Sequence, residues 1–246
     1  MVNKLYAIIP AVAVAIVAVV IVFAMPSQNN TIDVRSIDSD IKDTVSEANV
    51  KAADTEQSTK DPRLSIFVTG SPLLGSPDAP LTMVEFGDYQ CLNCNRYFHN
   101  TEHDILQNYV ETGKLKIIFV DFAFIGPDSL IAAQAAHCAQ EQGKYWEYHD
   151  ELYSNWDGEN TGWASKDNLK KFAANVDLNK SFNECLDSGK YASKVTNNIS
   201  IGRQLGVTGT PTFFLFKSTG DAQKIVGAQP YSTFNTVLDS MLKQQT

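Results

Sequence analysis

The chain has 246 residues, a formal net charge of -8 and four cysteines. Four cysteines cannot hold a chain of this length together, so a hydrophobic core must do so. The acidic balance gives no electrostatic footprint for nucleic acid, because phosphate binding needs clustered lysine and arginine side chains, so no nucleic-acid partner is expected.

An uncharged run from Leu5 to Met25 opens the chain. At about 1.5 Å per residue, a helix over this run would cross a hydrocarbon core of roughly 30 Å. The alternative is a cleaved signal peptide, whose apolar region is usually only about 7 to 15 residues long. The length of the run therefore favours a transmembrane signal anchor over residues 1–25, although the flanking charges set its orientation only weakly.

A polar segment, residues 26–63, follows and is rich in Ser, Asn, Thr, Asp and Lys. It shows no sustained period and is interpreted as a flexible linker. The folded part is predicted to begin at Leu64, where LSIFVT is typical of a short strand and is followed by a turn-rich loop.

A strand, helix and strand are predicted next. LTMVEFG, Leu81 to Gly87, is apolar on both faces, which is typical of a central strand covered on two sides. Cys91 to about Gly113 has apolar residues at helical spacing and predicts a long helix that the glycine ends. Leu115 to Phe122 is the next strand, so the three elements predict a parallel, right-handed crossover.

The pattern then becomes purely helical from Asp128 to about Leu205. TPTFFLFK and QKIVG restore strand character, and an amphipathic helix closes the chain. The simplest interpretation is a single α/β domain over residues 64–246 that carries an all-helical insertion at about 126–205.

Two cysteines separated by two residues, Cys91 and Cys94, follow the central strand. A strand that delivers Cys91 to the first turn of a helix places its sulfur against unpaired backbone N–H groups, which stabilise the thiolate. In such motifs the thiol pKa falls from about 8.5 to roughly 3.5 to 7.5. Cys94 lies deeper on the same helical face, where it can attack a mixed disulfide. We therefore predict a redox pair in which Cys91 meets the substrate and Cys94 releases it.

Two other interpretations of this pair are weaker. A zinc site needs four ligands, and the nearby His99 and His103 would lie along one continuous helix with the cysteines, so the four cannot converge. No metal is expected. A purely structural disulfide of this kind would close a very small ring and would constrain the unfolded chain little.

A Thr-Pro step, Thr210 and Pro211, opens the last apolar strand but one. A proline is allowed as the first residue of a strand, although it cannot donate to the sheet. A cis bond here would expose the Thr210 backbone to an extended peptide lying across Cys91. A trans proline that ends a loop is the commoner arrangement for a lone X-Pro bond.

Three separated motifs resemble the DsbA-like thiol:disulfide oxidoreductases of the thioredoxin superfamily. They are GSPDAPLTMVEFGDYQCLNC, the GTPTFF loop and the block AAHCAQEQGKYWEYHDELY, and the resemblance covers about Leu64 to Thr246. It implies a thioredoxin fold with an inserted helical domain, a cis Pro211 and a peptide groove near Thr210.

The resemblance also implies that Glu85 is a buried acid beneath the redox pair. Desolvation of a carboxylate there would raise its pKa and allow it to exchange a proton with Cys94. The alternative for Glu85 is an edge carboxylate in water. Asp88 is expected to cap the helix that starts near Cys91, and the alternative is an acid with a role similar to that of Glu85.

Leu92 and Asn93 stand between the two cysteines and are expected to contact the substrate. Many relatives place a proline and then a histidine or tyrosine there. Neither Leu92 nor Asn93 carries a positive charge that would stabilise the thiolate further. A milder oxidant than the strongest family members is therefore expected.

The other two cysteines, Cys138 and Cys185, each share a helical face with apolar residues of the insertion. In an oxidising exterior two such cysteines are expected to form a bridge, which would contribute about 4 kcal/mol on the loop-entropy model. The alternative is two buried free thiols that pack as small apolar groups.

The function expected from the sequence is an extracytoplasmic thiol:disulfide oxidoreductase, held at the cell membrane by a single span. It would form or exchange disulfides in cysteine-containing exported proteins, without a metal or organic cofactor. The resemblance implies a quinone-linked membrane thiol oxidase as the partner that reoxidises the pair. Two alternatives stay open: a disulfide reductase or isomerase of the same fold, and a non-catalytic peptide-binding chaperone module.

Overall fold

The computed structural model describes residues 66, 69–217 and 222–243. The membrane span and the linker predicted for residues 1–63 lie outside this part of the chain. Among the helices of the described residues, none is both long enough and apolar enough to cross a membrane.

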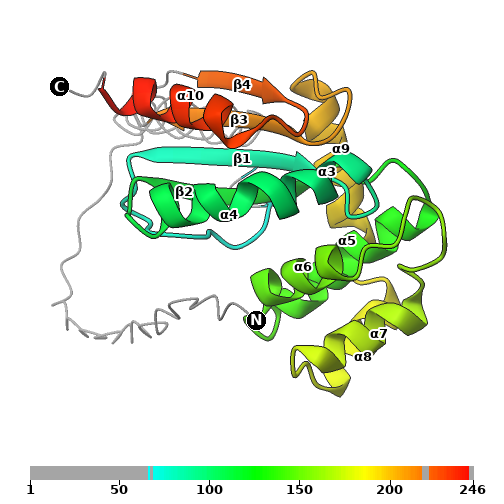
Figure 1. Cartoon of the computed structure of the whole chain (residues 1–246). Coiled ribbons are helices and arrows are strands. Elements are labelled where there is room, and N and C mark those ends of the chain that lie inside the picture. Colours follow the sequence, from blue (N-terminus) through cyan, green and yellow to red (C-terminus); the bar gives the residue numbers. More distant parts are fainter. Residues whose placement is uncertain (1–65, 67–68, 218–221, 244–246) are drawn as a thin grey trace, which may run out of the picture. The chain divides into compact units, whose positions relative to one another are not determined.

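Four strands form one mixed sheet in the order β2-β1-β3-β4 (Figure 1). β1 (Leu81–Gly87) pairs in parallel with β2 (Leu115–Asp121) and antiparallel with β3 (Thr212–Lys217), and β4 (Ala222–Val226) pairs antiparallel with β3. The parallel pair confirms the predicted crossover. All residues of β1 are buried, as expected for a strand covered on both faces.

One continuous helical run follows Cys91 and covers one face of the sheet. It consists of α3 (Leu92–Tyr97), η1 (Phe98–Glu102), α4 (His103–Ile105) and η2 (Leu106–Val110). The η segments have the wider π-helical hydrogen-bonding pattern, which the spacing of apolar residues does not reveal. Gly113 ends the run with a φ of 72°, a left-handed conformation that favours glycine, so the predicted helix is confirmed.

The C-terminal helix α10 (Tyr231–Lys243) packs on the same face. Tyr97, Phe213 and Phe234 form an aromatic cluster that joins the helical run, β3 and α10. Their ring centroids are 4.6, 5.5 and 4.9 Å apart, within the range of favourable aromatic pairs. This cluster fixes the helical run that follows Cys91 to the sheet.

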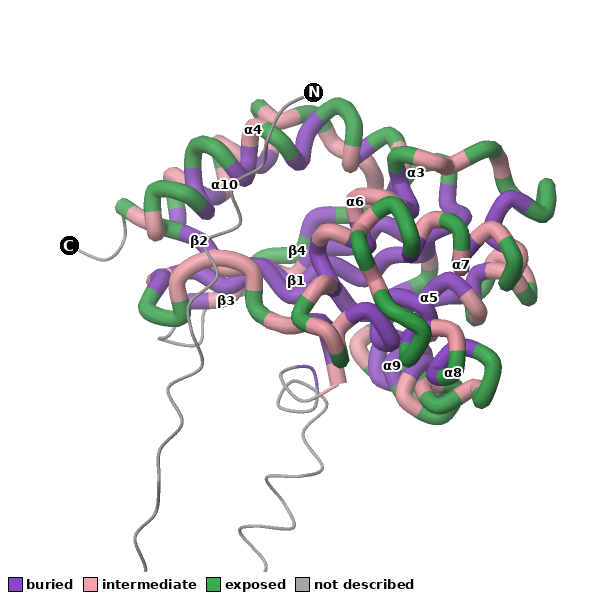
Figure 2. The backbone as a smooth tube through the Cα atoms, turned by 90° about the horizontal axis from the view of Figure 1, so that it is seen from below, coloured by how far each residue is buried: buried purple, intermediate pink, exposed green. Residues whose placement is uncertain are grey.

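The helical insertion supplies the other face. Its described helices are α5 (Pro127–Gln140), α6 (Tyr145–Ser154), α7 (Lys166–Asn175), α8 (Lys180–Ser188) and α9 (Ala192–Gln204). Val195 and Ile199 of α9 belong to one buried cluster with Val84, Phe86 and Val120 of the sheet. In Figure 2 the buried residues gather along the sheet and α5, whereas α8 and α10 carry many exposed residues.

The strand predicted for LSIFVT is wrong at its described residues. Ile66 and Thr69 are helical, and the N–H of Gly70 donates to the Ile66 carbonyl oxygen at 2.9 Å, one helical turn back. Ile66 is buried in the cluster that contains Val84 and Ile118. A short apolar run serves burial equally well as strand or helix, so its composition cannot decide between them.

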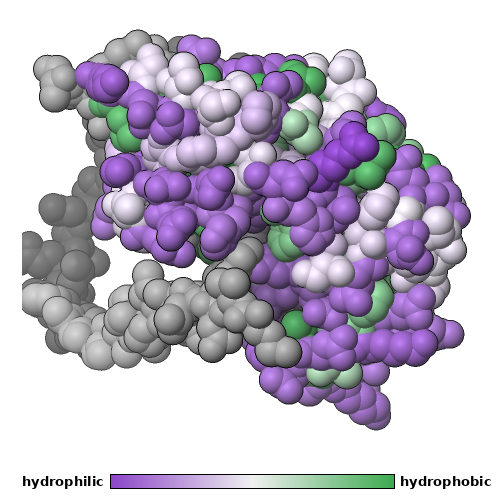
Figure 3. Space-filling view, viewed as in Figure 1, coloured by the Kyte–Doolittle hydropathy of each residue, from purple (hydrophilic) through white to green (hydrophobic). Residues whose placement is uncertain are grey.

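The surface drawn in Figure 3 is mostly hydrophilic, and its apolar residues occur in small separate groups. Scattered apolar residues of this kind are normal for a protein surface. No large apolar patch therefore stands out on the face that Figure 3 shows.

Candidate active site

The two cysteines predicted to form a redox pair lie where β1 meets the helical run. Cys91 is the N-cap residue of α3, and its N–H donates to the Asp88 carbonyl oxygen at 3.0 Å. Cys94 lies inside the first turn of the helix. Both are free thiols, but Cys94 is 0% exposed whereas Cys91 is 6% exposed. Cys91 therefore keeps a little exposed surface, whereas Cys94 keeps none.

The pKa of Cys91 is lowered to about 6. The largest cause is a hydrogen bond from the Cys94 thiol, and burial opposes it; the Thr210 side chain and the N–H groups of Cys94 and Asn93 lower the pKa further. The backbone N–H groups expected from the sequence therefore contribute, but less than the partner sulfur does. At neutral pH Cys91 is mainly thiolate, which makes it a nucleophile and a good leaving group.

The pKa of Cys94 is raised well above its ordinary value. Burial is the largest cause, and the charges of Cys91 and Glu85 act in the same direction. Since the two pKa values move apart, the reduced pair holds one proton, on Cys94, and one negative charge, on Cys91.

The loop before β3 lies against Cys91. Its Thr210–Pro211 peptide bond is cis, and the protonated Cys91 thiol donates to the Thr210 carbonyl oxygen at 3.4 Å. The carbonyl oxygen of Pro211 accepts from the N–H of Gly227 at 2.8 Å, which ties the loop to the end of β4. The main chain of Thr210 thus lies beside the Cys91 sulfur.

The two residues between the cysteines face the surface. Leu92 is 37% exposed, and Asn93 is also exposed. Asn93 opens onto a surface cavity of about 390 Å³, lined in addition by Arg96, Asn100, Thr101, Ala228, Pro230 and Tyr231. One side of the redox pair therefore presents an apolar side chain and the other a largely polar hollow.

Glu85 lies on β1 and is only 5% exposed, so the alternative of an edge carboxylate in water is excluded. Burial is the largest cause that raises its pKa well above the usual value, followed by the charges of Glu102 and Cys91. Glu102 on η1 is a second buried carboxylate that the sequence analysis missed, because its neighbours in the chain are polar and give no sign of burial. Tyr97 shares this environment, and burial, Glu85 and Glu102 raise its pKa.

Tyr89 is another residue that the sequence analysis missed. It lies two residues before Cys91, and its hydroxyl bonds the Nδ1 atom of His149 at 3.1 Å and the Tyr145 hydroxyl at 3.4 Å. These partners belong to α6, so Tyr89 joins the redox loop to the helical insertion. Among the described residues, the group of side chains able to hold a metal is Glu102, His149 and Asp150, and it includes neither cysteine.

The helix cap predicted at Asp88 is wrong. α3 has Cys91 as its N-cap residue and lacks a side-chain cap hydrogen bond. The Asp88 carboxylate instead accepts from the N–H groups of Gln90 at 2.9 Å, Phe124 at 2.9 Å and Ile125 at 3.1 Å. It ties the loop ahead of Cys91 to the loop after β2, and its burial raises its pKa although these bonds oppose the rise.

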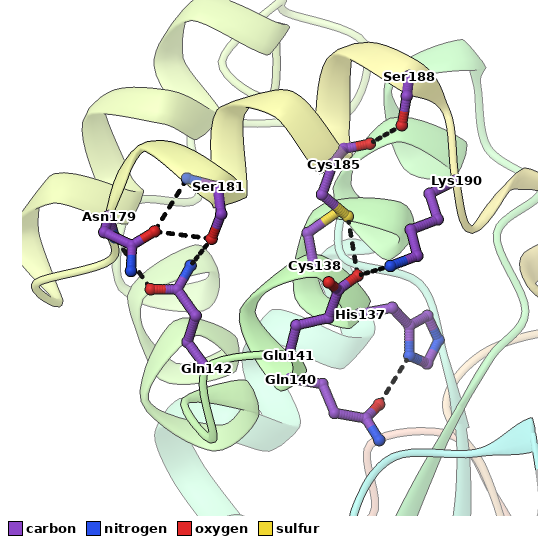
Figure 4. Close-up of a disulfide and its surroundings, with 10 residues drawn as sticks. All are labelled: His137, Cys138, Gln140, Glu141, Gln142, Asn179, Ser181, Cys185, Ser188 and Lys190. Atoms are coloured by element: carbon purple, nitrogen blue, oxygen red, sulfur yellow. Dashed lines mark hydrogen bonds and ion pairs between the residues drawn. A yellow bond between two sulfur atoms is a disulfide. The ribbon is translucent and has the colours of Figure 1, made fainter.

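Cys138 of α5 and Cys185 of α8 form a disulfide with an S–S distance of 2.03 Å and a Cα–Cα distance of 5.8 Å (Figure 4). Glu141 lies beside it, 3.4 Å from the Cys185 sulfur, and forms an ion pair of 2.8 Å with Lys190. Both sulfurs belong to the insertion, so this bond crosslinks its helices and is separate from the redox pair.

A family model described as thioredoxin matches residues 68–240 of this chain. The chain belongs to the thioredoxin family. Within the thioredoxin family it is similar to disulfide bond formation protein D of Bacillus subtilis, with 28% identity over 152 residues that cover 60% of this chain and 68% of that protein.

Two solved structures extend this similarity. Oxidised BdbD of Bacillus subtilis is 25% identical with a TM-score of 0.65, over 72% of this chain and 95% of the other. Alpha-DsbA1 of Wolbachia pipientis is 27% identical with a TM-score of 0.63, over 70% and 90%. The chain is thus a DsbA-like thiol:disulfide oxidoreductase of the thioredoxin family, as the resemblance implied.

Proposed function

We propose that this protein forms or exchanges disulfides in exported proteins through Cys91 and Cys94. The observation that carries the proposal is the contrast between the two thiols: Cys91 keeps a small exposed surface and has a pKa of about 6, and Cys94 is fully enclosed with a raised pKa. A stabilised Cys91 thiolate favours the reduced pair over its disulfide, so the oxidised protein tends to give its disulfide away. The name of the Bacillus subtilis relative, disulfide bond formation protein D, agrees with this direction.

The reaction starts from the oxidised pair. A substrate thiolate attacks the Cys91 sulfur, a disulfide forms between them, and the Cys91–Cys94 bond breaks with its electron pair on Cys94. A second substrate thiolate then attacks the substrate sulfur of this mixed disulfide and releases the Cys91 thiolate. The substrate loses two electrons to the pair; of its two protons, one remains on Cys94 and one passes to the solvent.

Glu85 passes its proton to Cys94 and then regains one of the protons that the substrate thiols release. Its burial and raised pKa keep it protonated at pH values where an exposed glutamate is ionised. Its charge also acts on Cys94, which indicates that the two groups share one enclosed environment. Proton transfer between them would spare the pair a buried second charge.

The substrate is an extended peptide. Its backbone pairs with Thr210 at the cis Pro211 loop, and its side chains beside the cysteine meet the exposed Leu92 and Asn93. Backbone pairing accepts many sequences, because the hydrogen bonds involve groups that every residue carries. This suits an enzyme that acts on many exported proteins.

In this proposal the domain works outside the cytoplasm, held at the membrane by the span expected at residues 1–25. The Cys138–Cys185 disulfide supports an oxidising compartment, since such crosslinks persist there. A quinone-linked membrane thiol oxidase would take the two electrons and restore the disulfide. The steps above require no metal or organic cofactor.

The test is oxidative refolding of reduced, unfolded RNase by the oxidised full-length protein, followed by the return of RNase activity. We expect Cys91→Ser to abolish turnover while peptide binding survives, which separates an enzyme from a binding module. The matched control replaces both Cys138 and Cys185 by serine and keeps turnover. Unchanged turnover in Cys91→Ser would contradict the proposal.

A redox titration against glutathione decides the direction of electron flow. A potential near that of thioredoxin, about -270 mV, would make the protein a reductase instead.

A further inference from the structure

A loop of the helical insertion, residues 156–160 between α6 and α7, holds both neighbours of Cys91. The indole N–H of Trp156 donates to the Gln90 carbonyl oxygen at 2.8 Å, and the N–H of Asn160 donates to the Gln90 side-chain oxygen at 2.8 Å. On the other side of the nucleophile, the carboxylate of Glu159 accepts from the N–H of Leu92 at 3.0 Å.

The backbone of this loop is set in an uncommon shape. Gly158 has a φ of 96° and Asn160 a φ of 59°, both in the left-handed region. A residue other than glycine rarely occupies that region unless its surroundings hold it there. The bond from the Asn160 N–H to Gln90 and the bond from the Asn160 side-chain amide to the Ile125 carbonyl oxygen provide that support. Glu159, which lies between the two residues of positive φ, is thereby presented to Leu92.

The N–H groups in the first turn of α3 have no carbonyl partner within the helix itself. Each of them instead has a partner at or before Cys91, or in the loop of residues 156–160. Those of Asn93 and Cys94 bond the Cys91 sulfur, and that of Asn95 donates to the Cys91 carbonyl oxygen at 3.0 Å. The remaining one, on Leu92, donates to Glu159. Two anions, the Cys91 thiolate and the Glu159 carboxylate, therefore share the positive end of one helix.

We propose that Glu159 is a positioning residue that limits the oxidising strength of the redox pair. The Glu159 carboxylate lies beside the peptide unit that joins Cys91 to Leu92, so its negative charge repels the Cys91 thiolate. It also accepts from the Leu92 N–H, one of the donors at the helix start that would otherwise favour the thiolate. Since the thiolate exists only in the reduced protein, Glu159 destabilises the reduced form relative to the disulfide. This inference rests on the proposed role of Cys91, and it gives the insertion a part in setting the redox equilibrium.

The experiment is a glutathione titration of the full-length protein and of Glu159→Gln at low ionic strength. In the measured equilibrium, two glutathione thiols reduce the Cys91–Cys94 disulfide and leave one glutathione disulfide. Glutamine keeps an oxygen for the Leu92 N–H and removes only the charge. We expect the equilibrium to move toward the reduced protein by roughly two- to fivefold, the size typical of a charge at a helix end. The absorbance of the Cys91 thiolate should then persist to lower pH.

Two controls separate charge from structure. Glu111→Gln makes the same chemical change at an exposed glutamate at the other end of the helical run, about 30 Å away at the helical rise, and should leave the equilibrium unmoved. At about 1 M salt, where the Debye length is about 3 Å, the effect of Glu159→Gln should shrink because the carboxylate is exposed.

An unmoved equilibrium in Glu159→Gln, a shift toward the disulfide, or a shift that Glu111→Gln reproduces would overturn the inference and leave the proposed function intact. An unmodified protein whose pair does not exchange with glutathione at all would overturn both. These two failures are distinguishable because the second is already visible before any substitution is made.

Discussion

The two cysteine pairs of this molecule are built in opposite ways. Cys91 and Cys94 lie in one helical turn as free thiols, and their pKa values are driven apart by their surroundings. Cys138 and Cys185 are 47 residues apart in the chain and are already bonded between two helices of the insertion. The first pair has an uneven environment that makes one sulfur reactive, whereas the second crosslinks a small core. The charge and the solvent exposure around each sulfur therefore distinguish a reactive cysteine pair from a structural disulfide.

The largest expected effect comes from removing the second sulfur of the reactive pair. Cys94→Ala leaves no disulfide to transfer, so turnover with reduced RNase should vanish. The pKa of Cys91 should also rise, because its main hydrogen-bond donor is lost. Turnover and the thiolate absorbance at 240 nm measure the two results, and retained turnover would show that the pair does not work as a unit.

The crosslink should respond in the opposite manner. Replacing Cys138 and Cys185 by alanine is expected to lower the free energy of unfolding by about 4 kcal/mol on the loop-entropy model, while turnover per folded molecule is preserved. Urea unfolding of the variant and of the unmodified protein checks this. A variant that is equally stable but inactive would reverse the roles that we assign to the two pairs.

The pH dependence of Cys91 sharpens the contrast further. With a pKa of about 6, its alkylation rate should rise about tenfold from roughly pH 5 to pH 8 and then level off. The pKa of Cys91 in the folded protein lies below that of an ordinary thiol. Ionisation of Cys91 therefore stabilises the reduced folded protein fully at pH values above the pKa of an ordinary thiol, and this stabilisation is lost as the pH falls through about 6. Iodoacetamide labelling followed by mass spectrometry measures the profile. A midpoint near that of free cysteine would remove the physical difference between the pairs.

The smallest of these effects is expected at Glu85. Glu85→Gln removes a carboxylate whose burial raises its pKa, so the protein should become more stable at pH 7. Because the pKa of Glu85 is raised in the folded protein, burying this group costs no stability at pH values below its unfolded-state pKa and costs progressively more above it. The added stability of Glu85→Gln should therefore disappear near about pH 4. Turnover should also slow, because proton delivery to Cys94 is lost. Urea unfolding at both pH values and stopped-flow reduction test this, and an unchanged stability would mean that Glu85 is hydrated.

Much of the fold can be predicted from the sequence because its signals are local. The apolar run of β1, the helical spacing after Cys91 and the glycine that ends that run each report on neighbours in the chain. The strand predicted around Ile66 fails for the same reason, since a short apolar run is satisfied by burial in either conformation. The π-helical segments η1 and η2 are also invisible to a periodicity argument, because they interrupt the period within one continuous helix.

The residues of the candidate site also differ in whether a local sequence signal reveals them. Cys91, Cys94 and Pro211 carry signals of spacing and residue type, whereas Glu102 and Glu159 carry none. Their importance comes from contacts between segments that are distant in the chain, such as the bond that the Leu92 N–H donates to Glu159, 67 residues away. The helix cap predicted at Asp88 is wrong for the opposite reason. Its local signal is clear, but its carboxylate accepts from N–H groups of the loop after β2 and does not cap the nearby helix.

The three tryptophans of the chain all lie in the helical insertion, and Trp156 bonds the carbonyl group of the residue just before Cys91. An excited indole is quenched by a nearby disulfide and less so by a thiol. We therefore expect the tryptophan fluorescence to rise when the Cys91–Cys94 disulfide is reduced, and a Trp156→Phe variant would show how much of this change the one ring supplies.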